Sequence, residues 1–271
     1  VEGDTAGVYP RLTLAGQGRA VCIPLESPPE RTVRLERCGE EAEAVAAYLQ
    51  ERLAAGGCAA VVCNRVSRAQ AVYQAVKARG FLGEGEAILF HARFPFERRE
   101  EIEKQVLNLF GKDGTRPKRA VVVATQVIEQ SLDLDFDLMV SDLAPVDLLI
   151  QRAGRLQRHR GRDAGRPAGL RSASLALCQT PLCEGLPVFG GDAKVYEEAT
   201  LLRSWLTLKD RGELRLPEDT SGLIEAVYSE GFPEGLADGL KQALTRADQA
   251  ARMRGDKEQY EAVKRLVGEV E

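Results

Sequence analysis

The run Ala-Val-Val-Val-Ala at residues 120–124 constrains the fold of this chain more than any other stretch. Its three consecutive β-branched residues favour a strand, and it offers no polar side chain to a solvent-exposed face. A continuously apolar strand is typical of a parallel sheet that helices cover on both sides, because both faces of the strand are then buried. The run therefore predicts an α/β fold.

Shorter apolar runs and helical patterns alternate along the chain on both sides of this strand. Further strands are expected at residues 58–63, 87–90, 138–140 and 175–177. Helices are expected at about 40–55, from a capping box of Ser67 and Gln70 to Gly80, from Pro95 to Gly111, and at 146–150. This alternation predicts a parallel sheet with right-handed crossovers. Ligands of such sheets bind at the carboxyl ends of the strands, so the residues after each strand are the candidate site.

The two ends of the chain differ from this central part. Residues 1–36 carry four prolines and little periodicity, and we expect a connector with short extended pieces there. From about residue 179 a loop rich in proline and glycine precedes a helix expected at about 193–208. Further helical stretches end in an amphipathic one expected at 256–270. The C-terminal part is therefore predicted to be a helical appendage.

Composition excludes several classes of protein. With 44% hydrophobic and 29% charged residues the chain is globular, and its net charge of −4 gives no overall basic field for nucleic acid. We find no run long enough to span a membrane and no signal peptide. The six cysteines form no C-x-x-C pair, and Cys58 and Cys63, at the two ends of an apolar strand, are expected to be buried thiols. This pattern favours a reducing cytoplasm without structural zinc or disulfides. The two histidines, His91 and His159, lie far apart, which argues against a histidine-based metal centre.

The segment Gln151–Arg158, Gln-Arg-Ala-Gly-Arg-Leu-Gln-Arg, carries the densest chemical signal. Residues 151–171 contain seven arginines and a single acidic residue, Asp163. Arg155 and Arg158 are three residues apart, so on a helix they would project from one face. Two guanidinium groups placed in this way can hold a triphosphate and stabilise the charge that develops in phosphoryl transfer. The alternative is a solvated basic helix face.

Three further segments directly follow predicted strands. The first, Thr125–Asp133, includes Gln126 and Glu129; its threonine hydroxyl and backbone N–H groups could hold a nucleic-acid phosphate, and its last carboxylate a ribose hydroxyl. A capped helix would explain this segment equally well. The second holds His91 and Arg93, which suit contacts to a single strand at the same sheet edge. Asn64 is a weaker candidate of the same kind. Trp205 is expected to belong to the core rather than to stack on a base.

At these residues the sequence resembles a known family. The segments 125–133 and 151–158 resemble motifs V and VI of superfamily 2 helicases, which hydrolyse ATP between two RecA-like lobes. Over residues 124–159 (ATQVIEQSLDLDFDLMVSDLAPVDLLIQRAGRLQRH) the chain looks like the helicase-nuclease of type I CRISPR systems, which the Cascade surveillance complex recruits. The stretches YPRLT, FHARFPFERRE and VYEEATLLRSWLTL also look like that family. Gln157 departs from the pattern, since the family more often has His there.

The resemblance implies a domain organisation and roles for individual residues. It implies a connector from a first lobe at 1–36, a second RecA-like lobe at 37–178, and a linker with the start of a helical accessory region at 179–271. Arg155 and Arg158 would be arginine fingers, and Asp133 would meet the ribose. Gln151 would contact the nucleotide or couple it to DNA. The nucleic acid would be contacted by residues that follow the strands, namely Asn64, His91, Arg93, Thr125, Gln126 and Glu129. The implied activity is ATP-driven translocation along single-stranded DNA in the 3′ to 5′ direction.

Several motifs of a complete enzyme of this kind do not occur in the sequence. There is no G-x-x-x-x-G-K-[ST] loop, no Asp-Glu-x-His or Asp-Glu-x-Asp tetrad and no His-Asp pair for a nuclease. The resemblance therefore implies that a first lobe binds most of the ATP and its Mg²⁺, that the HD nuclease domain lies elsewhere, and that this chain is inactive alone. The alternatives are a superfamily 2 motor that acts on RNA or in repair, and a non-catalytic nucleic-acid-binding module.

Overall fold

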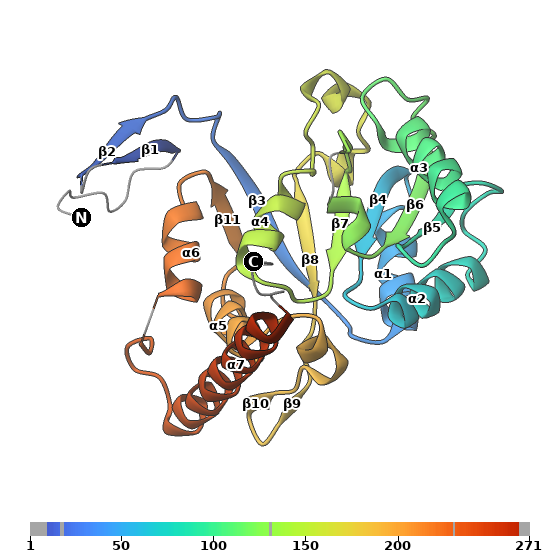
Figure 1. Ribbon diagram of the computed structural model, residues 1–271. Coiled ribbons are helices and arrows are strands. Elements are labelled where there is room, and N and C mark those ends of the chain that lie inside the picture. The colour runs from blue at the N-terminus through green and yellow to red at the C-terminus, as the bar shows by residue number, and fades with distance from the viewer. Residues whose placement is uncertain (1–9, 17–18, 130–131, 230, 266–271) are drawn as a thin grey trace, which may run out of the picture.

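The run at 120–124 forms β6 (Arg119–Ala124), one strand of a seven-stranded sheet at the centre of the molecule (Figure 1). The computed structural model describes residues 10–16, 19–129, 132–229 and 231–265. The strands lie in the order β11-β3-β8-β7-β4-β6-β5. The remaining strands are β3 (Arg31–Cys38), β4 (Gly57–Val62), β5 (Ala87–Phe90), β7 (Leu138–Ser141), β8 (Ser174–Cys178) and β11 (Glu213–Leu216). All neighbours are parallel except β11, which pairs antiparallel with β3, so the predicted parallel sheet is mixed at one edge.

Helices cover both faces of the sheet, as predicted. Successive residues of β4 enter opposite cores: Ala60 and Val62 face one side, and Ala59 and Val61 the other. The side of Ala59 is covered by α1 (Ala42–Arg52) and α2 (Val66–Ala78). The opposite side is covered by α3 (Phe96–Phe110) and α4 (Val146–Ala153). This double cover explains why the strands can be apolar along their whole length.

The helix boundaries follow the sequence signals except at α2. Pro95 stands immediately before α3 and Gly111 immediately after it, as expected. The predicted capping box of Ser67 and Gln70 is wrong, because α2 begins at Val66 and its N-cap residue makes no side-chain capping bond. The serine thus lies inside the first turn, where its hydroxyl cannot reach the N–H groups that a capping residue would satisfy.

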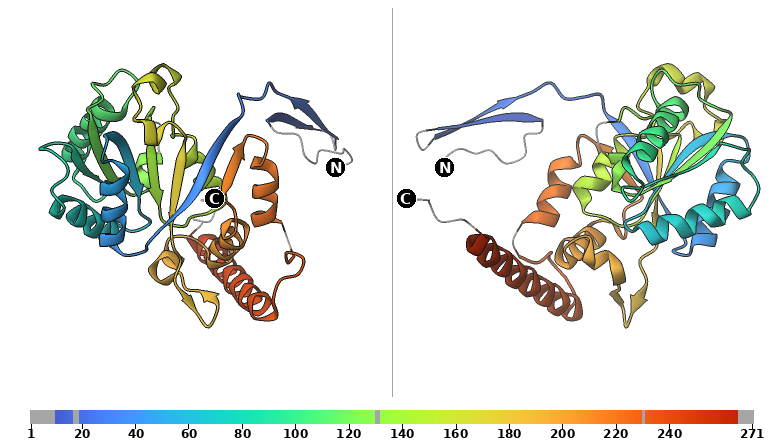
Figure 2. Two further views of the ribbon diagram at one scale, coloured as in Figure 1. Left: turned by 180° about the vertical axis from the view of Figure 1, so that it is seen from behind. Right: turned by 45° about the vertical axis from the view of Figure 1, so that its right-hand side comes forward.

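The sheet extends beyond residues 37–178 at both ends. Strand β3 begins at Arg31, within the predicted connector, and pairs with β8 from Arg34 to Cys38. Strand β11 comes from the predicted appendage. Their side chains alternate between exposed and buried positions, so Val33, Leu35 and Leu214 complete the core while their neighbours face solvent. Ahead of β3, the hairpin of β1 (Arg11–Gly16) and β2 (Arg19–Pro24) projects away from the sheet (Figure 2).

The C-terminal part is helical, with shifted boundaries. A short 3₁₀ helix, η4 (Gly190–Lys194), precedes α5 (Glu198–Leu208), α6 (Thr220–Tyr228) and α7 (Asp238–Arg265). Two short strands, β9 (Leu182–Cys183) and β10 (Leu186–Pro187), form a hairpin before them. Leu202 of α5 packs against Leu244 and Ala247 of α7 in a small separate core. The amphipathic helix expected at 256–270 is therefore the end of α7 as far as residue 265, and residues 266–270 lie outside the described residues.

Candidate functional site

The carboxyl ends of the parallel strands form one edge, and it gathers the residues that the sequence singled out there. Ala124, the last residue of β6, is paired in register with the last residue of β4 on one side and of β5 on the other. Asn64, His91 and Thr125 follow these strands within two residues, so the predicted placement at one sheet edge is confirmed. Thr125 is tied to the neighbouring strand because its backbone N–H donates to the carbonyl oxygen of Phe90 at 3.1 Å.

Asn64 is buried within this edge rather than presented to solvent. Its side-chain amide donates to the carbonyl oxygen of Leu143 at 2.7 Å and to Oδ2 of Asp192 at 3.0 Å. Its Oδ1 is buried without a hydrogen-bond partner among the described residues. Asn64 thus joins the end of β4 to the segment before α5, and contact with a nucleic acid stays a prediction.

His91 is also buried, whereas its neighbour Arg93 is exposed. The imidazole stacks on Phe94 with ring centroids 4.1 Å apart. Neither ring nitrogen has a hydrogen-bond partner in the part of the chain that the structure describes. Burial lowers the pKa of His91, and the nearby positive charge of Arg93 lowers it further. The imidazole is therefore neutral, and Arg93 is the group of this turn that a phosphate could reach.

The segment after β6 begins with a 3₁₀ helix, η1 (Gln126–Glu129). The side-chain amide of Gln126 donates to the carbonyl oxygen of Asn64 at 3.2 Å and to the hydroxyl of Tyr196 at 3.0 Å. The carboxylate of Glu129 accepts a hydrogen bond from Arg152 at 2.6 Å. Both side chains hold the lobe together in this conformation, so a DNA contact by either stays a prediction.

The second predicted cluster lies where α4 ends. Helix α4 stops at Ala153, and Gly154 follows as its C-cap, where an added Cβ would lie 2.8 Å from the carbonyl oxygen of Gln151. Gln157 has a φ of 46°, which turns the chain between the two candidate fingers. The prediction that Arg155 and Arg158 share a helical face is therefore wrong, because both lie beyond the helix.

The two candidate fingers differ in how firmly they are held. The guanidinium of Arg155 donates to the carbonyl oxygens of Leu132 and Glu129, the latter at 2.7 Å. Burial, and then the charge of Arg158, lower the pKa of Arg155. Arg158 is half exposed, and its Nε donates to Oδ1 of Asp133 at 2.8 Å. Within the described residues its two terminal nitrogens have no hydrogen-bond partner.

Asp133 holds Arg158 and His159 together. Its Oδ1 lies 3.0 Å from Nε2 of His159 as well as beside the arginine. Slight desolvation raises the pKa of Asp133, but His159 and Arg158 outweigh it, so the net shift is downward. The carboxylate is ionised and exposed, as a ribose contact would require. Gln151 is exposed on α4.

Two of the seven arginines at 151–171, Arg152 and Arg166, are buried within the lobe. Arg152 is 1% exposed; besides Glu129, it donates to Oγ of Ser141 at 2.7 Å and to the hydroxyl of Tyr196 at 3.3 Å. The sequence carried a signal for this burial, because position 152 lies three residues after Leu149 and six after Val146 on the apolar stripe of α4.

Arg166 is the other buried arginine, and it positions the turn that carries Arg158. It forms ion pairs with Asp135 at 3.0 Å and with Asp137, both fully buried. Oδ1 of Asp135 also accepts the backbone N–H of Arg158 at 2.7 Å. From the other side, Arg31 of β3 donates to the carbonyl oxygens of Ala153 and Leu156, at 2.9 and 3.0 Å. The turn that carries Arg155 and Arg158 is thus fixed on both sides by buried or half-buried groups.

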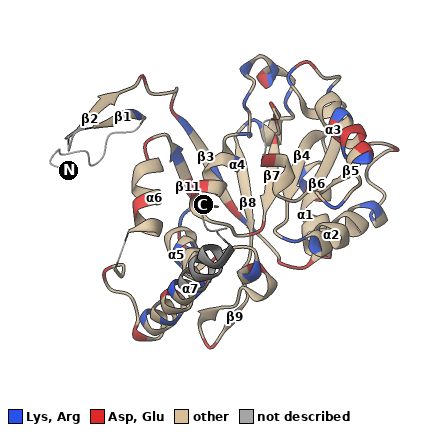
Figure 3. Cartoon of the chain, viewed as in Figure 1, with Lys and Arg blue, Asp and Glu red and all other residues tan. Residues whose placement is uncertain are grey.

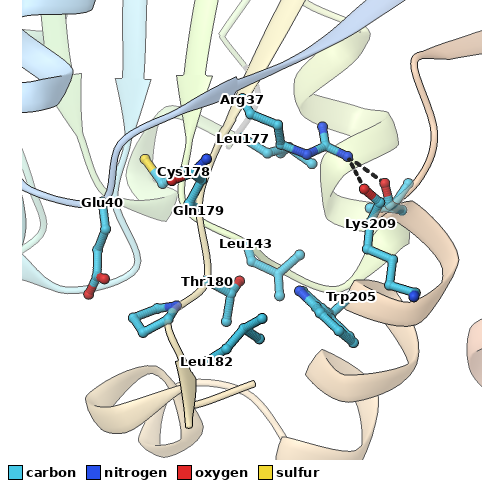
Figure 4. Close-up of a pocket in the computed structure, with 12 residues that line it drawn as sticks. Arg37, Glu40, Leu143, Leu177, Cys178, Gln179, Thr180, Leu182, Trp205 and Lys209 are labelled. Atoms are coloured by element: carbon cyan, nitrogen blue, oxygen red, sulfur yellow. Dashed lines mark hydrogen bonds between the residues drawn. The ribbon is translucent and has the colours of Figure 1, made fainter. Parts of the chain in front are cut away.

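A cavity of about 570 Å³ opens beside the carboxyl ends of β3 and β8, against α5 (Figure 4). Trp205 lines it and packs against the core, as expected, with Nζ of Lys209 5.4 Å from the centre of its ring. Arg37 donates to the carbonyl oxygens of Leu208 and Lys209, at 2.5 and 3.2 Å, and so joins β3 to the end of α5.

Several general features of the described residues bear on which ligands could bind. Basic and acidic residues are interspersed over the lobe (Figure 3), in keeping with the small net charge. The described part of the chain has no group of three or more His, Cys, Asp or Glu side chains that could hold a metal ion. It also has no helix that combines the length and apolarity needed to cross a membrane. All six cysteines are free.

A mostly parallel sheet with helices on both faces, carrying these two motifs behind its strands, defines a RecA-like lobe of the helicase class. The model of the family described as CRISPR-associated nuclease/helicase Cas3, C-terminal, matches residues 55–161. The CRISPR-associated endonuclease/helicase Cas3 of Thermus thermophilus is 37% identical over 301 residues, which cover 95% of this chain and 32% of the relative. The chain belongs to the Cas3 family and corresponds to its C-terminal helicase region.

Solved structures agree with this assignment. A crystal structure of a CRISPR-associated protein is similar with a TM-score of 0.85 at 47% identity, over 93% of this chain and 28% of that one. The crystal structure of T. fusca Cas3 with ATP gives 0.74 at 34% identity, over 88% and 29%. A CRISPR RNA-guided surveillance complex in the pre-nicking state gives 0.68 at 34% identity, over 88% and 30%. The chain spans about a third or less of the length of the first curated relatives it matches.

Proposed function

We propose that this chain is the second motor lobe of an ATP-dependent translocase on single-stranded DNA, acting in type I CRISPR defence. The observation that carries the proposal is the state of Arg158. Its half-exposed guanidinium is oriented by one carboxylate, and its two terminal nitrogens have no partner among the described residues. Two parallel N–H groups in this state match two oxygens of a phosphate.

The nucleotide would lie between this cluster and a first lobe outside the sequence. Arg158 can donate to a phosphate as it stands, whereas Arg155 must first leave the carbonyl oxygens of Glu129 and Leu132. ATP supplies a phosphoryl group whose transfer develops negative charge, and both arginines would stabilise that charge. Asp133 would orient Arg158 and meet the ribose, with Gln151 nearby on α4. Mg²⁺ would be held by the first lobe.

The carboxyl edge would contact the DNA strand. Arg93 is exposed there, and Thr125 begins the segment that leads from this carboxyl edge to Asp133. Closure of the two lobes on ATP and their reopening after hydrolysis would move the strand across this edge. We further propose that the complete protein acts with an HD nuclease domain and the Cascade complex, which the likeness to a surveillance complex supports. Six free cysteines suit work in the reducing cytoplasm.

The test compares the isolated 271-residue chain with a complete enzyme that contains it. The complete enzyme should show an ATPase activity that single-stranded DNA stimulates, and the isolated chain should show none, because it has no phosphate-binding loop. Measurable DNA-stimulated ATPase from the isolated chain would overturn this division of labour. Stimulation of the complete enzyme by RNA instead would indicate a different superfamily 2 motor. Salt-sensitive strand binding without any nucleotide effect would indicate a binding module.

A further inference from the structure

Tyr196 lies outside the predicted lobe, between η4 and α5, yet its hydroxyl contacts both helicase motifs. Nε2 of Gln126 donates to the hydroxyl at 3.0 Å, and Nη2 of Arg152 donates to it at 3.3 Å. The tyrosine is partly buried against the main core, and this burial raises its pKa above the ordinary value. The hydroxyl is therefore neutral, and it accepts one hydrogen bond from each motif.

The segment that carries Tyr196 is itself held at the carboxyl edge. Asp192, four residues earlier, accepts a hydrogen bond from the amide of Asn64 at 3.0 Å and one from Nε of Arg65 at 2.7 Å. The backbone N–H of Tyr196 donates to the carbonyl oxygen of Asp192 at 3.0 Å. The position of the tyrosine is thus set by the edge where we expect the DNA strand.

From Tyr196 the contacts continue to a candidate finger. Arg152 donates through Nε to the carboxylate of Glu129 at 2.6 Å. The backbone carbonyl oxygen of Glu129 accepts a hydrogen bond from Arg155 at 2.7 Å. A continuous series of hydrogen bonds therefore connects Gln126, at the carboxyl edge of the sheet, with Arg155, near the proposed nucleotide. Tyr196 is the member of this series that comes from outside both motifs.

We propose that Tyr196 is a positioning residue that couples DNA binding at the carboxyl edge to the placement of Arg155. This inference rests on the proposed function. Loss of the hydroxyl leaves the amide of Gln126 with one acceptor fewer and removes one of the four contacts of Arg152. The other three contacts of the arginine remain, so the fold persists while the two motifs lose their shared acceptor. Coupling between sites of this kind typically amounts to about 5-fold or more.

The test uses Tyr196→Phe in the complete enzyme and measures the ratio of the ATPase rate at saturating single-stranded DNA to the rate without DNA. We expect the ratio to fall about 5-fold or more, with the melting temperature nearly unchanged. Tyr228→Phe is the matched control. It also removes one hydroxyl contact between the C-terminal part and α4, a bond of 2.6 Å to Asp147, but lies outside the series. Its ratio should equal that of the wild type.

A double-mutant cycle supplies the second readout. If Gln126 acts through Tyr196, Gln126→Ala should change the ratio much less in the Tyr196→Phe background than in the wild type. Additive effects, or an unchanged ratio in Tyr196→Phe, would overturn the coupling while DNA stimulation of the wild type upholds the proposed function. A wild-type enzyme without DNA stimulation would overturn both. An equal fall in Tyr228→Phe would show a general effect of loosening α4, and would also overturn the coupling.

Discussion

Arg152 and Arg158 belong to the same eight-residue motif but lie in opposite environments. Arg152 is 1% exposed and donates to four partners from η1, the end of β7 and the segment before α5. The side chain of Arg158 is 52% exposed and bonds a single carboxylate. Helix α4 ends between them. One motif thus supplies both a structural anchor and a solvent-exposed guanidinium, and the spacing of its arginines does not tell the two apart.

The largest expected effect concerns the exposed Arg158 and the other candidate finger, Arg155. Arg158→Ala or Arg155→Ala in the complete enzyme should lower the rate of ATP hydrolysis about a thousand-fold or more, since a finger stabilises charge in the transition state. Most ATP binding should remain, because the first lobe would hold the rest of the nucleotide. Single-turnover hydrolysis and equilibrium binding of ATP measure the two quantities. Near-normal turnover would refute the finger assignment.

The next effect is on the buried side. Arg152→Met should lower the free energy of unfolding by about 3–5 kcal/mol, because it leaves the carboxylate of Glu129 mostly buried and unpaired. Arg158→Met is the matched control and should change it by about 0.5 kcal/mol or less. Urea unfolding of both variants measures the difference. Equal losses would erase the contrast between the two arginines.

The smallest expected effect is on the pH dependence of stability, and it comes from His91. Arg152 is buried with hydrogen-bond partners, whereas the buried ring nitrogens of His91 have none among the described residues. Because the pKa of His91 is lowered from 6.5, the unfolded chain binds a proton near that pH that the folded chain does not bind. Stability should therefore fall as the pH drops below about 6.5, by at most about 1.4 kcal/mol per pH unit from this group. His91→Phe should flatten the dependence of the melting temperature on pH between 7.5 and 5.5. A slope unchanged in this variant would assign the pH dependence to other groups.

The middle of the sheet could be predicted from sequence because strands such as β4, β7 and β8 are buried on both faces and are almost entirely apolar. Strand β3 escaped notice because only Val33 and Leu35 alternate there, next to a proline-rich stretch. Strand β11 pairs with β3, about 180 residues earlier in the sequence, and a local sequence pattern cannot reveal such a distant pairing.

For the candidate site, the placement of the residues could be predicted from the sequence, but their environments could not. Strand ends placed Asn64, His91 and Thr125 at one edge, since parallel strands in register must end together. The environments of these residues were not predictable, because Asn64 is enclosed by Asp192, 128 positions away in the sequence. The burial of Arg152 could have been inferred from the stripe of Val146 and Leu149, whereas the motif alone pointed to a phosphate.

Arg31 gives the lobe a mechanical property. It stands at the start of β3 and binds the carbonyl oxygens of Ala153 and Leu156, on the two sides of the helix end. Strand β3 lies between β8 and β11, so it cannot slide along the sheet without breaking its backbone hydrogen bonds to both neighbours. Tension applied to the chain between the hairpin and β3 would therefore act, through the Arg31 side chain, on the turn that carries Arg155 and Arg158.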